Sequence, residues 1–269
     1  MKFYEQSLTG QFHPVQLLGK TAYRRFQDWI LEEQDFAPSP IEGGVTQAKE
    51  KLKNLDVNNY SKTRNYLDGS ITMLSAYIEH GLIDPSEILK YIDSQRGRMQ
   101  AYDFLQQLSW RDFYQKKYFE NPEAIWENLE DYKTGFKHDD YGDFLPSDVL
   151  SATTNVAVIN EFIRELRENG YLHNHARLFL ASYIVHWRKV KWQVGARWML
   201  SHLIDGNLAS NNFSWQWVAS TGSKKAYIFN LETVRKYAKE GMNLSVEHNF
   251  AIYGSYEVLT QRLFPKKAA

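Results

Sequence analysis

The sequence predicts a mainly α-helical protein, a single multi-helical domain over residues 1–269, and three observations support this class. Apolar residues recur at intervals of three and four, which places them on one face of a helix. Helix start and stop signals are found along the whole chain. No alternating run of β-branched residues lies between hairpin turns, and no strand leads into a glycine-rich turn and a helix.

The first helices are expected at residues 19–33 and 70–80. In the earlier one, an apolar stripe is expected to be core: Tyr23, Phe26, Trp29 and Ile30. In the later one, the apolar face comprises Ile71, Leu74, Tyr77 and Ile78, and Gly81 follows as a C-cap. Residues 34–46 contain two prolines and Gly43-Gly44, so we expect a loop between these helices.

The clearest helix start is Asp84-Pro85-Ser86-Glu87, which combines an N-cap, a proline in the first turn and a reciprocal glutamate. It predicts a helix over residues 85–93. A long helix is expected at 101–119, and a loop rich in Asp, Gly, Tyr and Lys at 131–153. Two further helical stretches carry the apolar sets Phe162, Ile163 and Leu166, before Asn169-Gly170, and Trp198, Met199, Leu203 and Ile204.

Composition narrows the class of protein further. With 43% apolar residues the chain can bury a substantial core, and its 32 basic and 32 acidic residues balance, so any attraction to nucleic acid must be local. The absence of cysteine excludes disulfides and Fe–S clusters. No apolar stretch resembles a signal peptide or a membrane span, so we expect a cytoplasmic protein without membrane association.

The most specific motif occupies residues 203–222, which read LIDGNLASNNFSWQWVASTG. Its order of Asp, Asn and Trp closely resembles the photolyase/cryptochrome pattern LIDGDLAANNxxWQWxASTG. Similar elements lie upstream at Thr72–Tyr77, Leu108–Tyr114 and Tyr171–Arg177, and the resemblance is strongest over residues 41–240. It implies the multi-helical FAD-binding domain of this family in a short form. The family's N-terminal α/β domain lies outside the resemblance, so no antenna chromophore is expected.

The resemblance implies FAD as the cofactor and assigns residues to it. A buried flavin needs an acceptor for its N3–H, donors for its carbonyls and a partner at N5. Arg177 and Asp205 would form a charge-assisted pair beside the ring, and Asn211 would face N5, while Thr72, Ser75 and Arg111 would suit the pyrophosphate. The complete predicted cofactor-binding set is Tyr60, Thr72, Leu74, Ser75, Trp110, Arg111, Asn174, Arg177, Asp205, Asn207 and Asn211.

The resemblance also implies light-driven electron transfer. Trp215 and Trp192 match the first two members of the family's tryptophan chain, and the third has no counterpart. The residues offered to complete the path are Trp187, Tyr132, Phe136 and Tyr141.

The match to DNA-repairing members is weaker than the match at the flavin site. Trp110 and Trp217 correspond to the two tryptophans that stack on the damaged bases, but Gln107 stands where repairing members have a glutamate. An amide still donates and accepts hydrogen bonds but offers no carboxylate. His175 and Leu178 likewise replace an arginine and a methionine.

Two functions follow from these features. The first is a lyase that uses blue light to repair pyrimidine dimers, with damaged DNA, including single-stranded DNA, as partner. The alternative is a blue-light photoreceptor that signals to a protein partner through its flavin redox state. A light-independent flavin enzyme ranks last, because no nicotinamide site is recognisable. His173 and His175 do not share a helical face, so no metal site is expected.

Overall fold

The computed structural model describes residues 3–6, 12–15, 39, 41–95 and 97–265. They belong to two compact units, Met1–Pro38 and Ser39–Ala269, each of which we describe separately. In the first unit, β1 (Phe3–Gln6) and β2 (Phe12–Val15) pair antiparallel, with Phe3 opposite Val15. This hairpin was not predicted, because strands of four residues are too short to show a clear alternation in the sequence. The helix predicted at 19–33, with its apolar stripe, lies outside the described residues, and the assignment of 1–269 to one domain stays a prediction.

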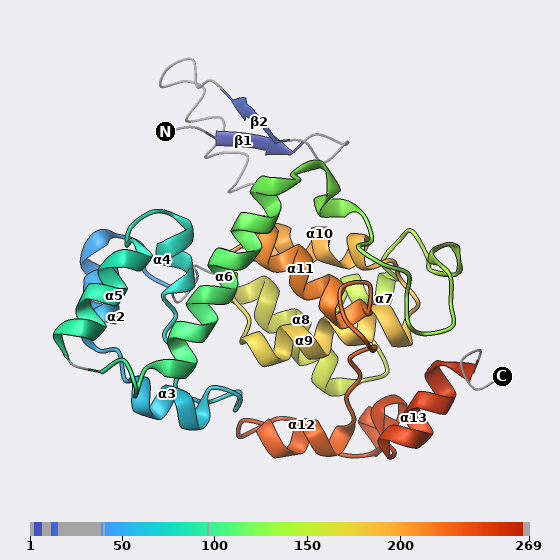
Figure 1. Cartoon of the computed structure of the whole chain (residues 1–269). Helices are drawn as coiled ribbons and strands as arrows, with labels where there is room; N and C mark the ends of the chain where they lie inside the picture. Colours follow the sequence, from blue (N-terminus) through green and yellow to red (C-terminus); the bar gives the residue numbers. More distant parts are fainter. Residues whose placement is uncertain (1–2, 7–11, 16–38, 40, 96, 266–269) are drawn as a thin grey trace, which may run out of the picture. The chain divides into compact units, whose positions relative to one another are not determined.

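The second unit is helical, as predicted, and Figure 1 shows the arrangement of its elements. Its first helices are α2 (Val45–Lys53), α3 (Val57–Thr63), α4 (Ser75–Glu79), α5 (Pro85–Ser94) and α6 (Tyr102–Glu120). The middle of the chain forms η1 (Glu123–Trp126), η2 (His138–Asp140), α7 (Ser147–Leu150), α8 (Ala157–Asn169), α9 (Asn174–Ser182) and the π-helical η3 (Tyr183–Trp187). The remainder comprises α10 (Trp192–His202), α11 (Leu208–Ala219), α12 (Leu231–Tyr237), η4 (Glu247–Ile252) and α13 (Tyr256–Leu263).

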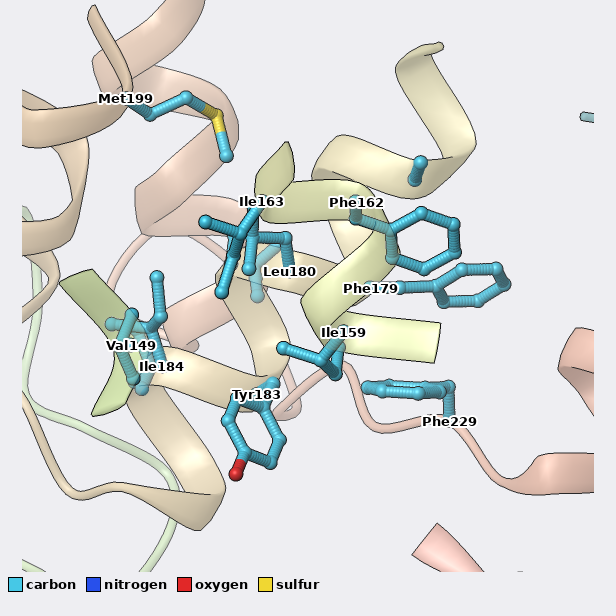
Figure 2. Packing of buried hydrophobic residues seen from close by; sticks show 14 of the residues in the cluster. Val149, Ile159, Phe162, Ile163, Phe179, Leu180, Tyr183, Ile184, Met199 and Phe229 are labelled. Carbon is cyan, nitrogen blue, oxygen red and sulfur yellow. The ribbon is translucent and has the colours of Figure 1, made fainter. Parts of the chain in front are cut away.

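Helix α6 divides the helical unit into two parts, each with its own core. Helices α2 to α5 lie on one side of α6, and α8 to α11 lie on the other (Figure 1). The smaller core includes Leu74, Tyr77, Ile88 and Phe104. The larger core is built on α8, α9 and α10 together with the segment before α12, and Figure 2 shows 14 of its residues, among them Phe162, Phe179 and Phe229.

Local signals in the sequence account for most helix boundaries. Asp84 caps α5 with the predicted capping box, in which Ser86 N–H donates to Asp84 Oδ1 at 2.7 Å and Asp84 N–H donates to Glu87 Oε1 at 3.1 Å. Helix α8 ends at Gly170, whose φ of 62° is left-handed. These predictions are confirmed.

Two predicted helices are shorter than expected. Residues 70–74 are not helical: Met73 has a φ of +53°, and the Leu74 N–H donates to Thr72 Oγ1 at 3.3 Å, so α4 begins only at Ser75. Helix α10 ends at His202, because the extended Leu203 turns the chain and the Ile204 N–H donates to Gly170 O at 2.7 Å. Apolar periodicity alone did not reveal either turn.

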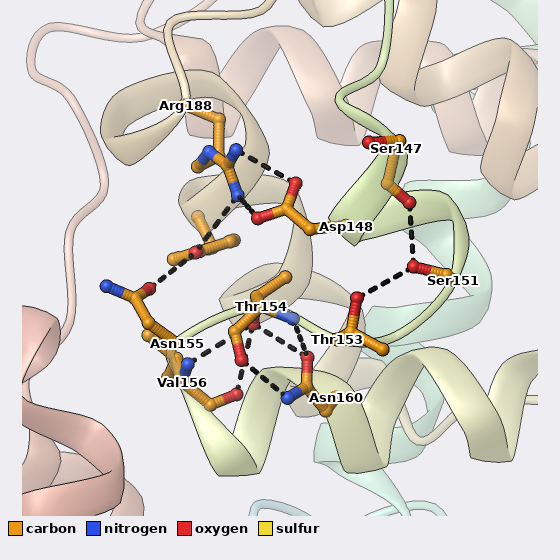
Figure 3. Close-up of polar contacts among 10 residues, drawn as sticks. Ser147, Asp148, Ser151, Thr153, Thr154, Asn155, Val156, Asn160 and Arg188 are labelled. Carbon is orange, nitrogen blue, oxygen red and sulfur yellow. Dashed lines mark hydrogen bonds and ion pairs between the residues drawn. The ribbon is translucent and has the colours of Figure 1, made fainter.

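A polar brace orders part of the predicted loop at 131–153. Arg188 makes a two-point ion pair with Asp148, with Nη1–Oδ2 at 2.7 Å and Nη2–Oδ1 at 2.9 Å (Figure 3). Beyond it, Asn160 Oδ1 accepts from Thr154 N–H at 2.8 Å and from its hydroxyl at 2.7 Å. The loop is thus tied to η3 and α8. Within the described ranges, no helix combines the length and the apolar character that crossing a membrane requires.

Candidate functional site

A cavity of about 290 Å³ opens between the two parts of the helical unit. One wall comes from α3, residues 71–75 and α6, and the other from α9, α10, α11 and the turn before α11. All of the predicted cofactor-binding residues line it: Tyr60, Thr72, Leu74, Ser75, Trp110, Arg111, Asn174, Arg177, Asp205, Asn207 and Asn211. Gln107 and Trp215 line it too, whereas Trp192 and Trp217 do not. The fold therefore gathers residues that lie up to about half the chain apart.

Asp205 forms the polar centre of this cavity. Its side chain is 4% exposed and accepts from Arg177 Nη2 at 2.9 Å on each carboxylate oxygen, and from the Ser75 hydroxyl at 2.7 Å. Arg177 is held in place because its Nε donates to Leu172 O at 2.7 Å, and its guanidinium lies 5.1 Å from the Tyr171 ring centroid. Burial raises the pKa of Tyr171 to about 12, so the phenol keeps its proton at neutral pH.

Glu79 was not among the predicted site residues. At the end of α4, its Oε2 accepts from Arg111 Nη2 at 2.5 Å and from Asn207 Nδ2 at 2.9 Å. Asn207 Oδ1 in turn accepts from Gln115 Nε2 at 2.7 Å. The charge of Arg111, predicted to suit the pyrophosphate, is therefore balanced by a carboxylate. No local motif marks Glu79 or Gln115, because these contacts join residues distant in sequence.

Asn211 and Ser210 leave hydrogen-bonding capacity for a ligand. Asn211 Nδ2 donates to Ala196 O at 3.1 Å and to Asn212 Oδ1 at 3.0 Å, and its own Oδ1 has no partner among the described residues. The Asn211 carbonyl is thus an acceptor for an N–H in the cavity. The Ser210 hydroxyl is buried on the cavity lining without a partner in the described protein. A buried hydroxyl of this kind fits a polar group of a bound cofactor.

Trp215 reaches the cavity because α10 and α11 approach closely. A Cβ added to Gly195 would lie within 2.5 Å of Cζ3 of Trp215, so only glycine leaves room for this ring. Trp215 is 2% exposed. The position of the indole is therefore set by a residue without a side chain.

Trp192 has an aromatic neighbour that was not predicted. Trp192 is fully buried, donates its N–H to Asn128 Oδ1 at 2.7 Å and stacks on Trp126, with ring centroids 6.3 Å apart and planes 10° apart. Trp126 was not among the residues predicted to belong to the tryptophan chain. Tyr132 and Tyr141 stack on each other at 4.2 Å, and Trp187 packs against Tyr183 and Phe229.

The two tryptophans predicted to stack on a lesion have different surroundings. Trp110 lines the cavity and is 49% exposed, so it forms part of the rim. Trp217 is 43% exposed and lies 5.3 Å from the ring of Tyr227 rather than in the cavity lining. The structure thus places only Trp110 beside the predicted flavin site.

The histidines have structural surroundings. His173 Nδ1 accepts from the His175 N–H at 3.1 Å and so caps α9, while His175 packs between Phe179 and Tyr237. Desolvation lowers the pKa of His173 to about 4. No group of three His, Cys, Asp or Glu side chains suited to a metal ion occurs in the part of the chain that the structure describes.

The fold and the cavity define a helical cofactor-binding domain with a charge pair at its centre. Residues 104–243 match the family model described as the FAD binding domain of DNA photolyase, and the chain belongs to this family. The deoxyribodipyrimidine photo-lyase of Streptomyces griseus is 30% identical over 199 residues, covering 71% of this chain and 42% of that protein. The Escherichia coli enzyme of the same name is 28% identical over 218 residues, covering 73% of this chain and 43% of that protein. The chain therefore spans less than half the length of these two relatives.

Solved structures show the same fold. A class III photolyase from Agrobacterium tumefaciens aligns with a TM-score of 0.61 at 22% identity, over 82% of this chain and 45% of that one. A Synechocystis cryptochrome aligns with a TM-score of 0.65 at 19% identity, over 84% of this chain and 51% of that one. The predicted family, fold and cofactor are confirmed: the domain is of the photolyase/cryptochrome type and its cofactor is FAD.

Proposed function

We propose that this protein repairs pyrimidine dimers in DNA, including single-stranded DNA, by light-driven electron transfer from FAD bound in the cavity. The observation that carries the proposal is the half-exposed Trp110 on the rim of a cavity lined by the predicted flavin ligands. Gln107, one turn earlier on α6, lines the same cavity. A damaged base flipped out of its strand would therefore meet a stacking surface and an amide beside the flavin.

Each of these side chains has a distinct role in the proposal. The Trp110 indole stacks on the flipped bases, and the Gln107 amide donates to and accepts from their edges. The Arg177–Asp205 pair would orient the cofactor, and the Asn211 carbonyl would accept a hydrogen bond from a protonated flavin N5. FAD held in this cavity in its reduced form would lend the dimer one electron under light and take it back once the dimer has split, so that the overall reaction involves no net oxidation. A cytoplasmic location stays part of the proposal.

The test combines a spectrum with a repair assay. The purified protein is examined by absorption before and after blue light, and is then illuminated with a dimer-containing single-stranded oligonucleotide. Restored thymines together with a flavin spectrum support the proposal. Trp110→Ala should abolish repair even in the protein molecules that still hold FAD, and Trp217→Ala should weaken repair less. Retained FAD without repair in the wild-type protein would exclude the lyase.

One pair of observations favours the photoreceptor as the second candidate. Gln107 offers no carboxylate to the lesion, and Trp217 lies outside the cavity lining. A protein that photoreduces its flavin, leaves dimers intact and binds a protein partner only after illumination would have this function. The oligonucleotide assay separates the two candidates directly.

A further inference from the structure

An aromatic cluster continues from the cavity rim along the outer face of α6. Trp110 lies with its ring centroid 5.8 Å from Phe113 and 6.0 Å from Tyr114. Tyr114, which lines the cavity, stacks on Phe213 of α11 at 5.4 Å with planes 21° apart. The inner rings are half-buried, whereas Phe113 is 44% exposed and lies outside the cavity lining. The cluster therefore has a supported inner part and an outer ring that faces solvent.

The two exposed rings present separate faces. The planes of Trp110 and Phe113 are 85° apart, so the rings meet edge to face and do not cover each other. Two ligand rings that stacked on them would also be turned by about a right angle. Neighbouring bases in a duplex are parallel and cannot do this, whereas a flipped base and its neighbour in a single strand can.

The charges around Phe113 show what kind of contact to expect. Lys117 Nζ lies 5.9 Å from the Phe113 centroid and pairs with Glu120 at 3.2 Å, each side chain being 50% exposed. Such an exposed pair is weak, so the ammonium can turn to a phosphate at little cost. Lys116 and Asp112 are also exposed on α6, so the positive and negative charges there balance. Stacking, rather than charge, would therefore supply most of the binding free energy.

We propose that Phe113, supported by Tyr114 and Phe213, is a stacking subsite for the base adjacent to the lesion in single-stranded DNA. This inference rests on the proposed repair function, because it assumes that the lesion itself occupies the cavity beside Trp110. It adds a second ring contact outside the cavity and a phosphate contact from Lys117. Phe113 contacts Trp110 on the cavity rim, and Lys117 lies beside its exposed ring. An aromatic ring next to a positive charge suits a nucleotide, which has a base that can stack and a phosphate.

The test measures affinity as a function of oligonucleotide length. FAD-loaded protein in the dark is titrated with a thymine-dimer dinucleotide and with trimers that carry one extra base on the 5′ or the 3′ side. One aromatic stack per base predicts that one of the trimers binds about 5- to 150-fold more tightly than the dinucleotide. Phe113→Ala should lose this gain while keeping the affinity for the dinucleotide, and Phe113→Trp should restore it.

Two matched variants serve as controls. Phe119 lies on the same helix, is 74% exposed and contacts Tyr118 rather than Trp110, so Phe119→Ala should keep the full gain. Lys117→Ala should weaken trimer binding at low salt more than Lys116→Ala does, and the difference should fade as salt is raised. The loss caused by Phe113→Ala should persist at high salt, because stacking is not screened.

The outcomes separate this inference from the function on which it rests. Binding of the dinucleotide without any gain from a third base would overturn the subsite and leave the repair function standing. Equal weakening of dinucleotide and trimer by Phe113→Ala would also overturn it. If Phe113→Ala instead converts a dimer of this protein into monomers with the gain intact, the ring belongs to a protein interface. Absence of all oligonucleotide binding would overturn both proposals.

Discussion

Replacing Asp205 by Asn should destabilise the flavin-free protein by about 3 kcal/mol. The carboxylate is 4% exposed and takes three hydrogen bonds, two from Arg177 at 2.9 Å and one from Ser75 at 2.7 Å. Asn can keep the bond from Ser75, but its NH₂ group would face the guanidinium. Breaking a buried ion pair costs about 3–5 kcal/mol, and Arg177 is 21% exposed, which favours the lower end of that range.

The assay is urea unfolding followed by circular dichroism, and Asp148→Asn is the matched control. The Asp148 and Arg188 side chains are 36% and 24% exposed, so losing this pair should cost about 1 kcal/mol. Asp205→Asn should also lose FAD on gel filtration, whereas Asp148→Asn should retain it. Equal unfolding midpoints for the two variants, or full FAD occupancy in Asp205→Asn, would refute the reasoning.

Two further predictions concern a buried histidine and the tryptophan path. Burial lowers the pKa of His186 to about 4, so the unfolded chain takes up a proton at a higher pH than the folded protein, and the free energy of unfolding should fall as pH drops from about 6.5 to 4. In urea titrations, His186→Gln should reduce this slope by up to about 1.4 kcal/mol per pH unit. An unchanged slope would contradict the prediction. Because Trp126 stacks on Trp192, Trp126→Phe should slow the photoreduction of bound flavin by a thiol severalfold, whereas Trp187→Phe should leave its rate unchanged. The opposite pattern would assign the electron path to Trp187.

Helices were predictable wherever a cap and an apolar face agreed. Helix α5 shows both, with its capping box at Asp84 and with Ile88 and Ile92 buried, and α8 ends at Gly170 as expected. Residues 70–74 carry the same apolar spacing, but the left-handed Met73 turns this segment along the cavity wall. Tertiary contacts along the cavity outweigh the helix propensity of this segment, and apolar spacing in the sequence does not reveal such contacts.

The site was predictable where it depended on a long motif and not where it depended on contacts between distant elements. The motif at 203–222 contains Asp205, Asn207 and Asn211, and the fold brings all three to the cavity, while their binding of FAD stays a prediction. It said nothing about Glu79, whose carboxylate balances Arg111 across two helices. The stacking of Trp126 on Trp192 was not predictable for the same reason, since the two residues lie 66 positions apart and meet only through folding.

Gly195 has a consequence for how variation in this protein should be interpreted. Gly195 does not line the cavity, yet any side chain at this position would displace the Trp215 ring from the cavity. A mutational scan would therefore report position 195 as intolerant even to alanine, and a survey limited to polar or aromatic side chains would overlook it. In the design of a new flavin pocket on this scaffold, glycine should be kept at position 195 before any ligand is chosen.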